Sequence, residues 1–347
     1  MNLNVNQVSR RNVVNVVNIV NIVIAMSVSA LAACAAPPPR TAPISASAEK
    51  TLTKVRLPMG FIPNIQYAPY YIAVDKGYFA TEGIELEFDY KFETDGLKLV
   101  GAGELPFAIV SGEQVVLARS KQVPVIYVMQ WFQKFPIAIV ASGKANINSP
   151  ADLKGKTVGL PGLFGATYVG WRAFLNANGL SEADVKQEAI GFTQVAALSE
   201  GKKDVVVGYV SNEPIQLESK GVPIKVFRVS DQVNMVANGI LTSDKVAKEN
   251  PELVRRFIRA VLKGMADTVS NPDEAMKISA KYVETLKSDD AVQRKVLDAT
   301  IELMKGGSKP GASDESAWEN TQATLLAMGQ IKEKMDVKTY YSNAFLP

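Results

Sequence analysis

MGFIPNIQYAPYYIAVDKGYF, residues 59–79, runs from the end of one predicted strand into a predicted helix. Lys54–Phe61 has strand character, and residues 62–66 contain the Pro-Asn pair of a loop. The apolar spacing of Tyr67–Phe79 predicts a helix, with Gly77 near its end. Residues 84–90 then alternate apolar and polar side chains, as a half-buried strand does. Strand, helix and strand in succession indicate an α/β unit.

The same rhythm continues toward the C-terminus and predicts a largely parallel sheet with helices on both faces. Ser111 is positioned to cap the helix that follows it. The predicted helices lie at residues 96–102 and 112–120, and the predicted strands at residues 107–111 and 123–130.

A second α/β unit follows, and beyond it the pattern becomes helical. Strands are predicted at 135–140, near 157–159, and at 185–192, 205–209 and 225–229, with helices at 149–155, 164–175, 194–200 and near 212. From Leu241 onwards nearly everything reads as helix, at 243–248, 251–270, 272–284, 288–305 and 315–328. These last helices are expected to pack back on the first unit.

The predicted fold class is therefore α/β, with two Rossmann-like α/β domains joined by two crossing hinge segments. Domain 1 is discontinuous, residues 51–138 with 236–347, and domain 2 is inserted, residues 139–235. Ligands of open α/β sheets bind at the carboxyl ends of the strands. The expected site is thus a cleft between the two domains, which closes over its ligand by a hinge motion.

The N-terminus reads as an export signal. Residues 1–34 hold two basic residues, Arg10 and Arg11, no acidic residue, and an apolar stretch that ends in Leu-Ala-Ala-Cys34. This ending resembles the bacterial lipobox, whose Cys is acylated, so Cys34 is the expected lipidation site. Residues 35–50 are rich in Pro and Ala and read as a tether. Ser9 before the arginine pair leaves twin-arginine export open, and which membrane carries the anchor is also open.

An uncleaved membrane helix is the alternative for this segment. Asn15, Asn18 and Asn21 interrupt the apolar run, and polar groups are costly inside lipid. Export with a lipid anchor on the extracytoplasmic face is therefore the favoured interpretation.

Composition narrows the possible chemistry. The chain has no His and a single Cys, which argues against Ser-His-Asp and Cys-His nucleophiles and against His or thiolate metal sites. Removing the two signal arginines lowers the net charge from +3 to +1, too weak a field for nucleic acid. We expect no catalytic residue, metal or cofactor, and a monomer that binds a small molecule.

Three segments resemble one family. Residues 59–79 with Gly83 and Ile84 are similar to the opening of type II periplasmic binding proteins, in the subgroup related to the fungal thiamine-pyrimidine synthase. Residues 149–159 are similar to the start of that family's second domain, and residues 250–257 to its C-terminal helix signature. The resemblance spans about 53–290. Residues 103–114 look most like the branch that delivers riboflavin or thiamine-pyrimidine precursors.

Candidate ligand-binding residues follow from the strand-to-helix junctions. Each candidate also has a purely structural explanation: the polar residues can belong to turns or helix caps, and Trp131 can pack in the core. The candidates in domain 1 are Asn64, Gln66, Tyr67, Glu93, Ser111, Glu113, Gln114 and Trp131.

In domain 2, Phe164 and Thr167 stand in a Gly-rich stretch that opens a helix. Tyr209 and Glu213 form a Tyr-x-x-x-Glu pair similar to that of the pyrimidine-precursor binders, in which Tyr stacks and Glu meets a ring nitrogen or amine. Asn212 beside them would suit the imide edge of an isoalloxazine. The alternative is an ordinary helix start, with Pro214 in its first turn.

The favoured function is a solute-binding lipoprotein that delivers an aromatic vitamin, riboflavin first, to an ABC permease. The candidates include no Arg or Lys cluster, which a sulfonate or nitrate would usually recruit. A pyrimidine precursor, or such an anion, remains an alternative. A synthase-like enzyme is disfavoured because that chemistry consumes a His, and a membrane-tethered sensor would need a separate receptor.

Overall fold

β1 (Thr53–Gly60) and β2 (Ile84–Phe92) form a parallel two-stranded sheet in the computed structural model, which describes residues 52–347. The predicted signal peptide, Cys34 and the tether lie outside the described residues. The connection between the two strands contains η1 (Ile65–Tyr67), α1 (Ala68–Asp75) and α2 (Tyr78–Thr81). The single helix predicted for Tyr67–Phe79 is thus wrong. Gly77 has a φ of 71°, a left-handed conformation that ends α1.

A three-stranded sheet lies beside this pair and contains a strand that we did not predict. Its order is β3 (Ala108–Ser111), β10 (Asn238–Ser243), β4 (Val125–Gln130), and β10 is antiparallel to both neighbours. The prediction of a largely parallel sheet and the omission of a strand at residues 238–243 are therefore corrected here. The five helices predicted beyond residue 243 are confirmed, with small differences at their ends. Every residue of β10 is buried. A strand buried on both faces lacks the alternation that sequence patterns detect.

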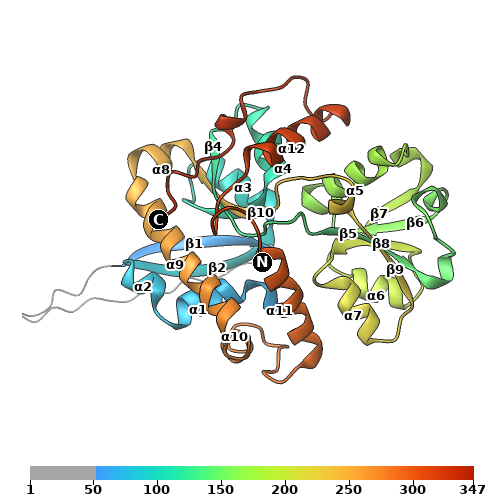
Figure 1. The fold of residues 1–347 in the computed structure, drawn as a ribbon, viewed down its shortest axis with the longest axis horizontal. Helices are drawn as coiled ribbons and strands as arrows, with labels where there is room; N and C mark the ends of the chain where they lie inside the picture. Colours follow the sequence, from blue (N-terminus) through green and yellow to red (C-terminus); the bar gives the residue numbers. More distant parts are fainter. Residues whose placement is uncertain (1–51) are drawn as a thin grey trace, which may run out of the picture. The chain divides into compact units, whose positions relative to one another are not determined.

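The third sheet has five strands, in the order β7-β6-β8-β5-β9. Their bounds are β5 (Ile137–Ser142), β6 (Thr157–Leu160), β7 (Lys186–Ala189), β8 (Val205–Tyr209) and β9 (Ile224–Arg228). β6 runs parallel to β7 and β8, whereas β5 is antiparallel to β8 and β9. This sheet, green to yellow in Figure 1, is also mixed rather than largely parallel.

Helices cover both faces of the five-stranded sheet. Ile137 and Ile139 of β5 belong to the core cluster that holds the α5 residues Trp171 and Phe174, whereas Val140 packs in a separate cluster with α6 and α7 residues. Alternate residues of one strand thus face opposite layers. These helices are α5 (Gly165–Ala177), α6 (Gln194–Ser199) and α7 (Glu213–Ser219).

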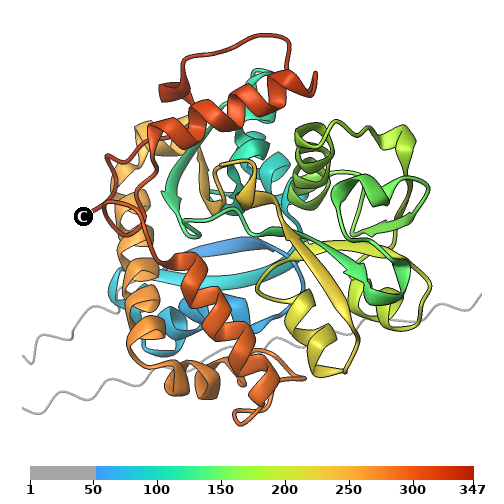
Figure 2. The ribbon, with the colours of Figure 1, turned by 45° about the vertical axis from the view of Figure 1, so that its right-hand side comes forward.

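The chain crosses between the three-stranded and the five-stranded sheets twice. It leaves β4 for β5 through residues 131–136, and it returns from β9 to β10 through residues 229–237. Figure 2 lets both crossings be followed. They are the segments on which the predicted hinge would act.

The remaining helices flank the first two sheets. Their bounds are α3 (Glu93–Gly101), α4 (Gly112–Arg119), α8 (Asp244–Glu249), α9 (Pro251–Ser270), α10 (Pro272–Ser279), α11 (Ala291–Met304) and α12 (Glu315–Ala327). α9 packs on α1 and α2, while α11 contacts both η1 and α7, and α12 contacts both α4 and α5. The last two helices therefore contact elements on both sides of the crossings.

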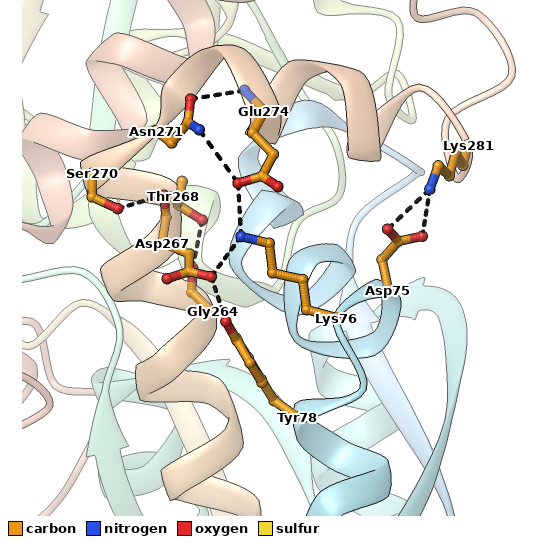
Figure 3. A network of polar contacts seen from close by, with 10 residues as sticks. All are labelled: Asp75, Lys76, Tyr78, Gly264, Asp267, Thr268, Ser270, Asn271, Glu274 and Lys281. Carbon is orange, nitrogen blue, oxygen red and sulfur yellow. Dashed lines mark hydrogen bonds and ion pairs between the residues drawn. The ribbon is translucent and has the colours of Figure 1, made fainter.

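A polar network joins α1 and α2 to α9 and α10 (Figure 3). Lys76 Nζ donates to Asp267 Oδ2 at 2.8 Å and to Glu274 Oε2 at 2.7 Å. The Tyr78 hydroxyl donates to the same Asp267 oxygen at 2.6 Å. These contacts raise the pKa of Lys76, so its ammonium group stays charged. Lys76 thereby links α9 and α10 to the segment that connects β1 to β2.

Candidate functional site

A pocket with an empty volume of about 710 Å³ lies between the ends of the first sheets and the five-stranded sheet. Aromatic side chains dominate its wall: Phe61, Tyr67, Phe92, Trp131, Phe164, Phe192 and Tyr209. We call it the aromatic pocket.

The floor of this pocket is a stack of buried rings. Tyr67 and Trp131 lie with centroids 5.7 Å apart, and Trp131 stacks on Phe132 at 4.0 Å. The Tyr67 hydroxyl donates to the Met59 carbonyl oxygen at 2.7 Å, and burial raises the pKa of Tyr67. Tyr67 and Trp131 are 2% and 1% exposed. Their packing fixes both rings before any ligand arrives.

The mouth is formed by four phenylalanines that meet from opposite sides. Phe61 follows β1 and Phe92 ends β2, whereas Phe164 and Phe192 belong to the segments that follow β6 and β7. Phe61 meets Phe192 at 4.7 Å between centroids, and Phe92 meets Phe164 at 5.1 Å. Phe164 is 46% exposed. An apolar ring left in water at a pocket mouth is surface that a ligand would bury.

Amide groups meet one another beside Tyr209. The side-chain amide of Asn238, at the start of β10, lies 3.0 and 3.2 Å from the Tyr209 hydroxyl through its nitrogen and oxygen. Asn212 Oδ1 accepts from Gln216 Nε2 at 2.7 Å. Gln66 also lines the pocket. These groups supply donors and acceptors at the edge of an otherwise apolar cavity.

Glu213 lines the pocket but is engaged by its own junction. Its Oε2 accepts from the Tyr209 backbone N–H at 2.7 Å, and its Oε1 accepts from Asn212 Nδ2 at 3.1 Å. Gly208 permits this return, since a Cβ there would lie 2.4 Å from Glu213 Oε2. Burial raises the pKa of Glu213. The carboxyl organises the Tyr209 turn, and both of its oxygens already have partners within the protein.

Glu93 links the two sides of the pocket. Its Oε1 accepts from the Ala166 backbone N–H, in the first turn of α5, at 2.9 Å. The same oxygen accepts from the Ser111 hydroxyl at 3.0 Å. An anionic group at a helix N-terminus is favourable, because unpaired N–H groups point toward it. The hydrogen bond between Glu93 and the Ala166 N–H therefore connects α3 to α5 across the pocket.

Ser111 also contacts Glu113, whose Oε1 accepts from Gln114 Nε2 at 3.2 Å. One hydroxyl carries one hydrogen, so Ser111 can serve both carboxyl groups only if one of them is protonated. Burial raises the pKa of Glu93 and of Glu113, and for Glu113 the nearby Glu93 raises it further. Ser111 does not cap α4 through its side chain, so that expectation was wrong.

The structure gathers most of the predicted candidates around this one pocket. Those that line it are Gln66, Tyr67, Glu93, Trp131, Phe164, Thr167, Tyr209, Asn212 and Glu213. Asn64 instead caps η1 through the Gln66 backbone N–H, and it lines an adjoining pocket. Ser111, Glu113 and Gln114 are absent from the lining of the aromatic pocket.

Several residues that line the aromatic pocket were not among the predicted candidates. Phe61, Phe92 and Phe192 follow or end strands at their carboxyl side, so the junction rule could have found them. Phe61 and Phe192 instead looked like the last residues of predicted strands, and Phe92 fell just beyond the strand predicted at residues 84–90. Asn238 was missed because β10 was not predicted. Gln194, at the start of α6, stands at the junction of the strand and helix predicted at 185–192 and 194–200, so the same rule could have found it.

The lining of the aromatic pocket contains no Lys or Arg. Within residues 52–347, no cluster of three or more His, Cys, Asp or Glu side chains is placed to hold a metal ion. In the same part of the chain, no helix combines the length and the apolar character needed to cross a membrane. The chemistry on offer is stacking, amide hydrogen bonding and a few buried carboxyl groups.

Known proteins are similar to this chain in sequence and in fold. A family model described as NMT1/THI5 like matches residues 64–275. The riboflavin-binding protein RibY of Chloroflexus aurantiacus is 43% identical, over 91% of this chain and 94% of its own. The formylaminopyrimidine-binding protein of Halalkalibacterium halodurans is 28% identical, over 86% and 92%.

Among solved structures, the alkanesulfonate-binding protein SsuA of Xanthomonas axonopodis pv. citri, bound to MOPS, is similar with a TM-score of 0.66. It is 15% identical and covers 83% of this chain and 98% of its own. At that identity the likeness concerns the fold alone. It agrees with the predicted α/β periplasmic binding protein architecture.

Proposed function

We propose, since this chain belongs to the NMT1/THI5-like family, that it is the solute-binding protein of an ABC importer and captures riboflavin in the aromatic pocket. The composition of the pocket wall carries this proposal: seven aromatic side chains and no cation. A planar ring gains from offset stacking and edge contacts with such side chains. A sulfonate or nitrate would instead recruit Arg or Lys.

The polar edge of the pocket suits the same ligand. An isoalloxazine carries an imide with one N–H donor between two carbonyl acceptors. The amides of Gln66, Asn212 and Asn238 can supply the matching acceptor and donors. The name of the Chloroflexus relative supports riboflavin over other flat heterocycles.

Capture is proposed to be followed by delivery rather than by chemistry. The chain has no His to serve as acid, base or consumed reactant. Domain 2 would close on domain 1 about the two crossings, and the closed monomer would dock on a membrane permease. Acylation at Cys34 and the tether of residues 35–50 would keep it on the extracytoplasmic face.

A thiamine-pyrimidine precursor is the second candidate ligand. The Halalkalibacterium relative, named for a formylaminopyrimidine, supports it, as does the Tyr209 and Glu213 pair. Glu213 accepts one hydrogen bond at each oxygen from its own turn and keeps a second lone pair on each, so it can also accept from a ring amine.

Isothermal titration of the purified chain tests these alternatives with riboflavin, a formylaminopyrimidine, taurine and nitrate. We expect saturable one-site binding of riboflavin, at least about tenfold tighter than any other compound, or about 1.4 kcal/mol. Tighter binding of the pyrimidine would transfer the proposal to the second candidate. Binding of taurine or nitrate without riboflavin would refute both.

A further inference from the structure

A second pocket opens beside the aromatic pocket and shares part of its wall. Its empty volume is about 880 Å³. The side chains common to both pockets are Phe61, Phe192, Gln194, Asn212 and Glu213. The two pockets are therefore adjacent, and a ligand longer than a ring system could extend from one into the other past these shared side chains.

The chemistry changes from one pocket to the other. Six of the nine lining residues beyond the shared wall have polar side chains: Asn64, Thr193, Ser199, Glu200, Gln216 and Lys220. No aromatic side chain lines it other than the two shared phenylalanines. We call it the polar pocket. A ring gains little there, whereas a hydroxylated chain finds partners.

The hydrogen bonds already made leave mainly acceptors free. Gln216 uses its Nε2 on Asn212 Oδ1 at 2.7 Å, and within the described residues no hydrogen bond reaches its Oε1. The Thr193 hydroxyl donates to the Ile190 carbonyl oxygen at 2.7 Å, and the Ser199 hydroxyl donates to that of Ala196 at 3.2 Å. Both hydroxyl oxygens keep lone pairs. Free acceptors match the O–H donors of a polyol.

We propose that the polar pocket binds the polyol tail of the ligand, along Thr193, Ser199 and Gln216, while its ring lies in the aromatic pocket. This rests on the proposed function and deepens it, because it names the ligand class as a planar heterocycle that carries a linear polyol. A bare ring would leave the polar pocket to water and forgo its hydrogen bonds.

The test compares riboflavin with lumiflavin, which has the same ring and a methyl group in place of the ribityl tail. We expect the unmodified chain to bind riboflavin at least about tenfold more tightly, the worth of one or two net hydrogen bonds. Gln216→Leu should weaken riboflavin about fivefold, and lumiflavin by less, because Gln216 also donates to Asn212 of the aromatic pocket. Glu218→Gln, on the exposed face of the same helix, is the matched control and should change neither.

Thr193→Val changes a residue that lines the polar pocket alone, so it should weaken riboflavin and leave lumiflavin within about twofold, and it also serves if Gln216→Leu folds poorly. Equal affinity for the two flavins, or an equal loss for both in Gln216→Leu, would overturn the polyol site while leaving riboflavin as the ligand. Failure of both flavins to bind the unmodified chain would overturn the proposed function, and the polyol site with it.

Discussion

The floor and the mouth of the aromatic pocket are built from the same kind of side chain in opposite states. Tyr67 and Trp131, at the floor, are almost fully buried and stacked among other rings. Phe164, at the mouth, is 46% exposed and meets Phe92 across the pocket. The floor is therefore part of the protein core, and the mouth is surface that has yet to be covered.

This difference in burial assigns the floor residues to folding stability and the mouth residues to ligand affinity. A buried ring contributes to folding whether or not ligand is present, because its packing is complete. An exposed ring contributes to affinity, because ligand removes it from water. Substitutions at the floor should thus act on the unfolding free energy, and substitutions at the mouth on binding.

Trp131→Ala should have the largest effect. Trp131 contacts Tyr67, Tyr70 and Phe132, and replacing a buried Trp by Ala costs about 3–5 kcal/mol of unfolding free energy. Urea unfolding followed by circular dichroism measures the loss. Trp131→Phe, which keeps a ring, should lose less. A loss under about 1 kcal/mol in the alanine variant would show that the floor is not core.

Glu93→Gln should flatten the pH dependence of stability. Because burial raises the pKa of Glu93 in the folded state, protonation favours folding: the contribution is fully present below the unfolded pKa and is lost as pH rises through the folded pKa. Each unit of pKa difference is worth about 1.4 kcal/mol. Gln keeps an oxygen that can accept from the Ala166 N–H.

Unfolding free energies measured from pH 4 to pH 9 check this, with Glu113→Gln compared in parallel. The unmodified chain should lose stability as pH rises through the titration of the Glu93 and Glu113 pair, and each variant should lose less. An unchanged slope in both variants would contradict the shared-proton arrangement around Ser111.

Phe164→Ala should weaken riboflavin about tenfold and barely change stability, because the ring is half exposed. Leu163→Ala is the matched control: Leu163 is 44% exposed, next in sequence, and absent from the lining of the aromatic pocket. Titration calorimetry and thermal unfolding measure the two effects separately. Equal losses of affinity in both variants would mean that the mouth has no specific role.

Lys76→Met should have the smallest effect. The network around Lys76 is partly exposed and does not line the aromatic pocket, and such ion pairs contribute about 1 kcal/mol or less. Thermal unfolding at low and high salt should show a small loss that salt diminishes. A change in riboflavin affinity of more than about twofold would show that the contacts of α9 and α10 are energetically coupled to the aromatic pocket.

How far a strand is buried decided whether it could be predicted from the sequence. Alternating or apolar strands followed by helices were readable at β1, β2 and β8, so the α/β class and most junctions followed from pattern alone. β10 was not readable, because full burial removes the polar half of the pattern. Because β10 was not predicted, Asn238 and the antiparallel arrangement of the three-stranded sheet were not predicted either.

Within the site, sequence position identified residues but not their partners. Tyr67 and Trp131 were expected to contact ligand, and only the fold shows how completely they are packed. Glu213 was expected to meet ligand, yet its bond to the Tyr209 backbone depends on Gly208. Ser111 between two carboxyl groups depends on elements that are distant in sequence.

A crystal structure of the chain with riboflavin would test the central claim most directly. We expect the isoalloxazine ring between the floor and the mouth of the aromatic pocket, covering Phe164, with the ribityl chain directed toward Gln216. A ring bound elsewhere on the protein, or a ribityl chain inside the aromatic pocket with the ring outside it, would refute this binding mode.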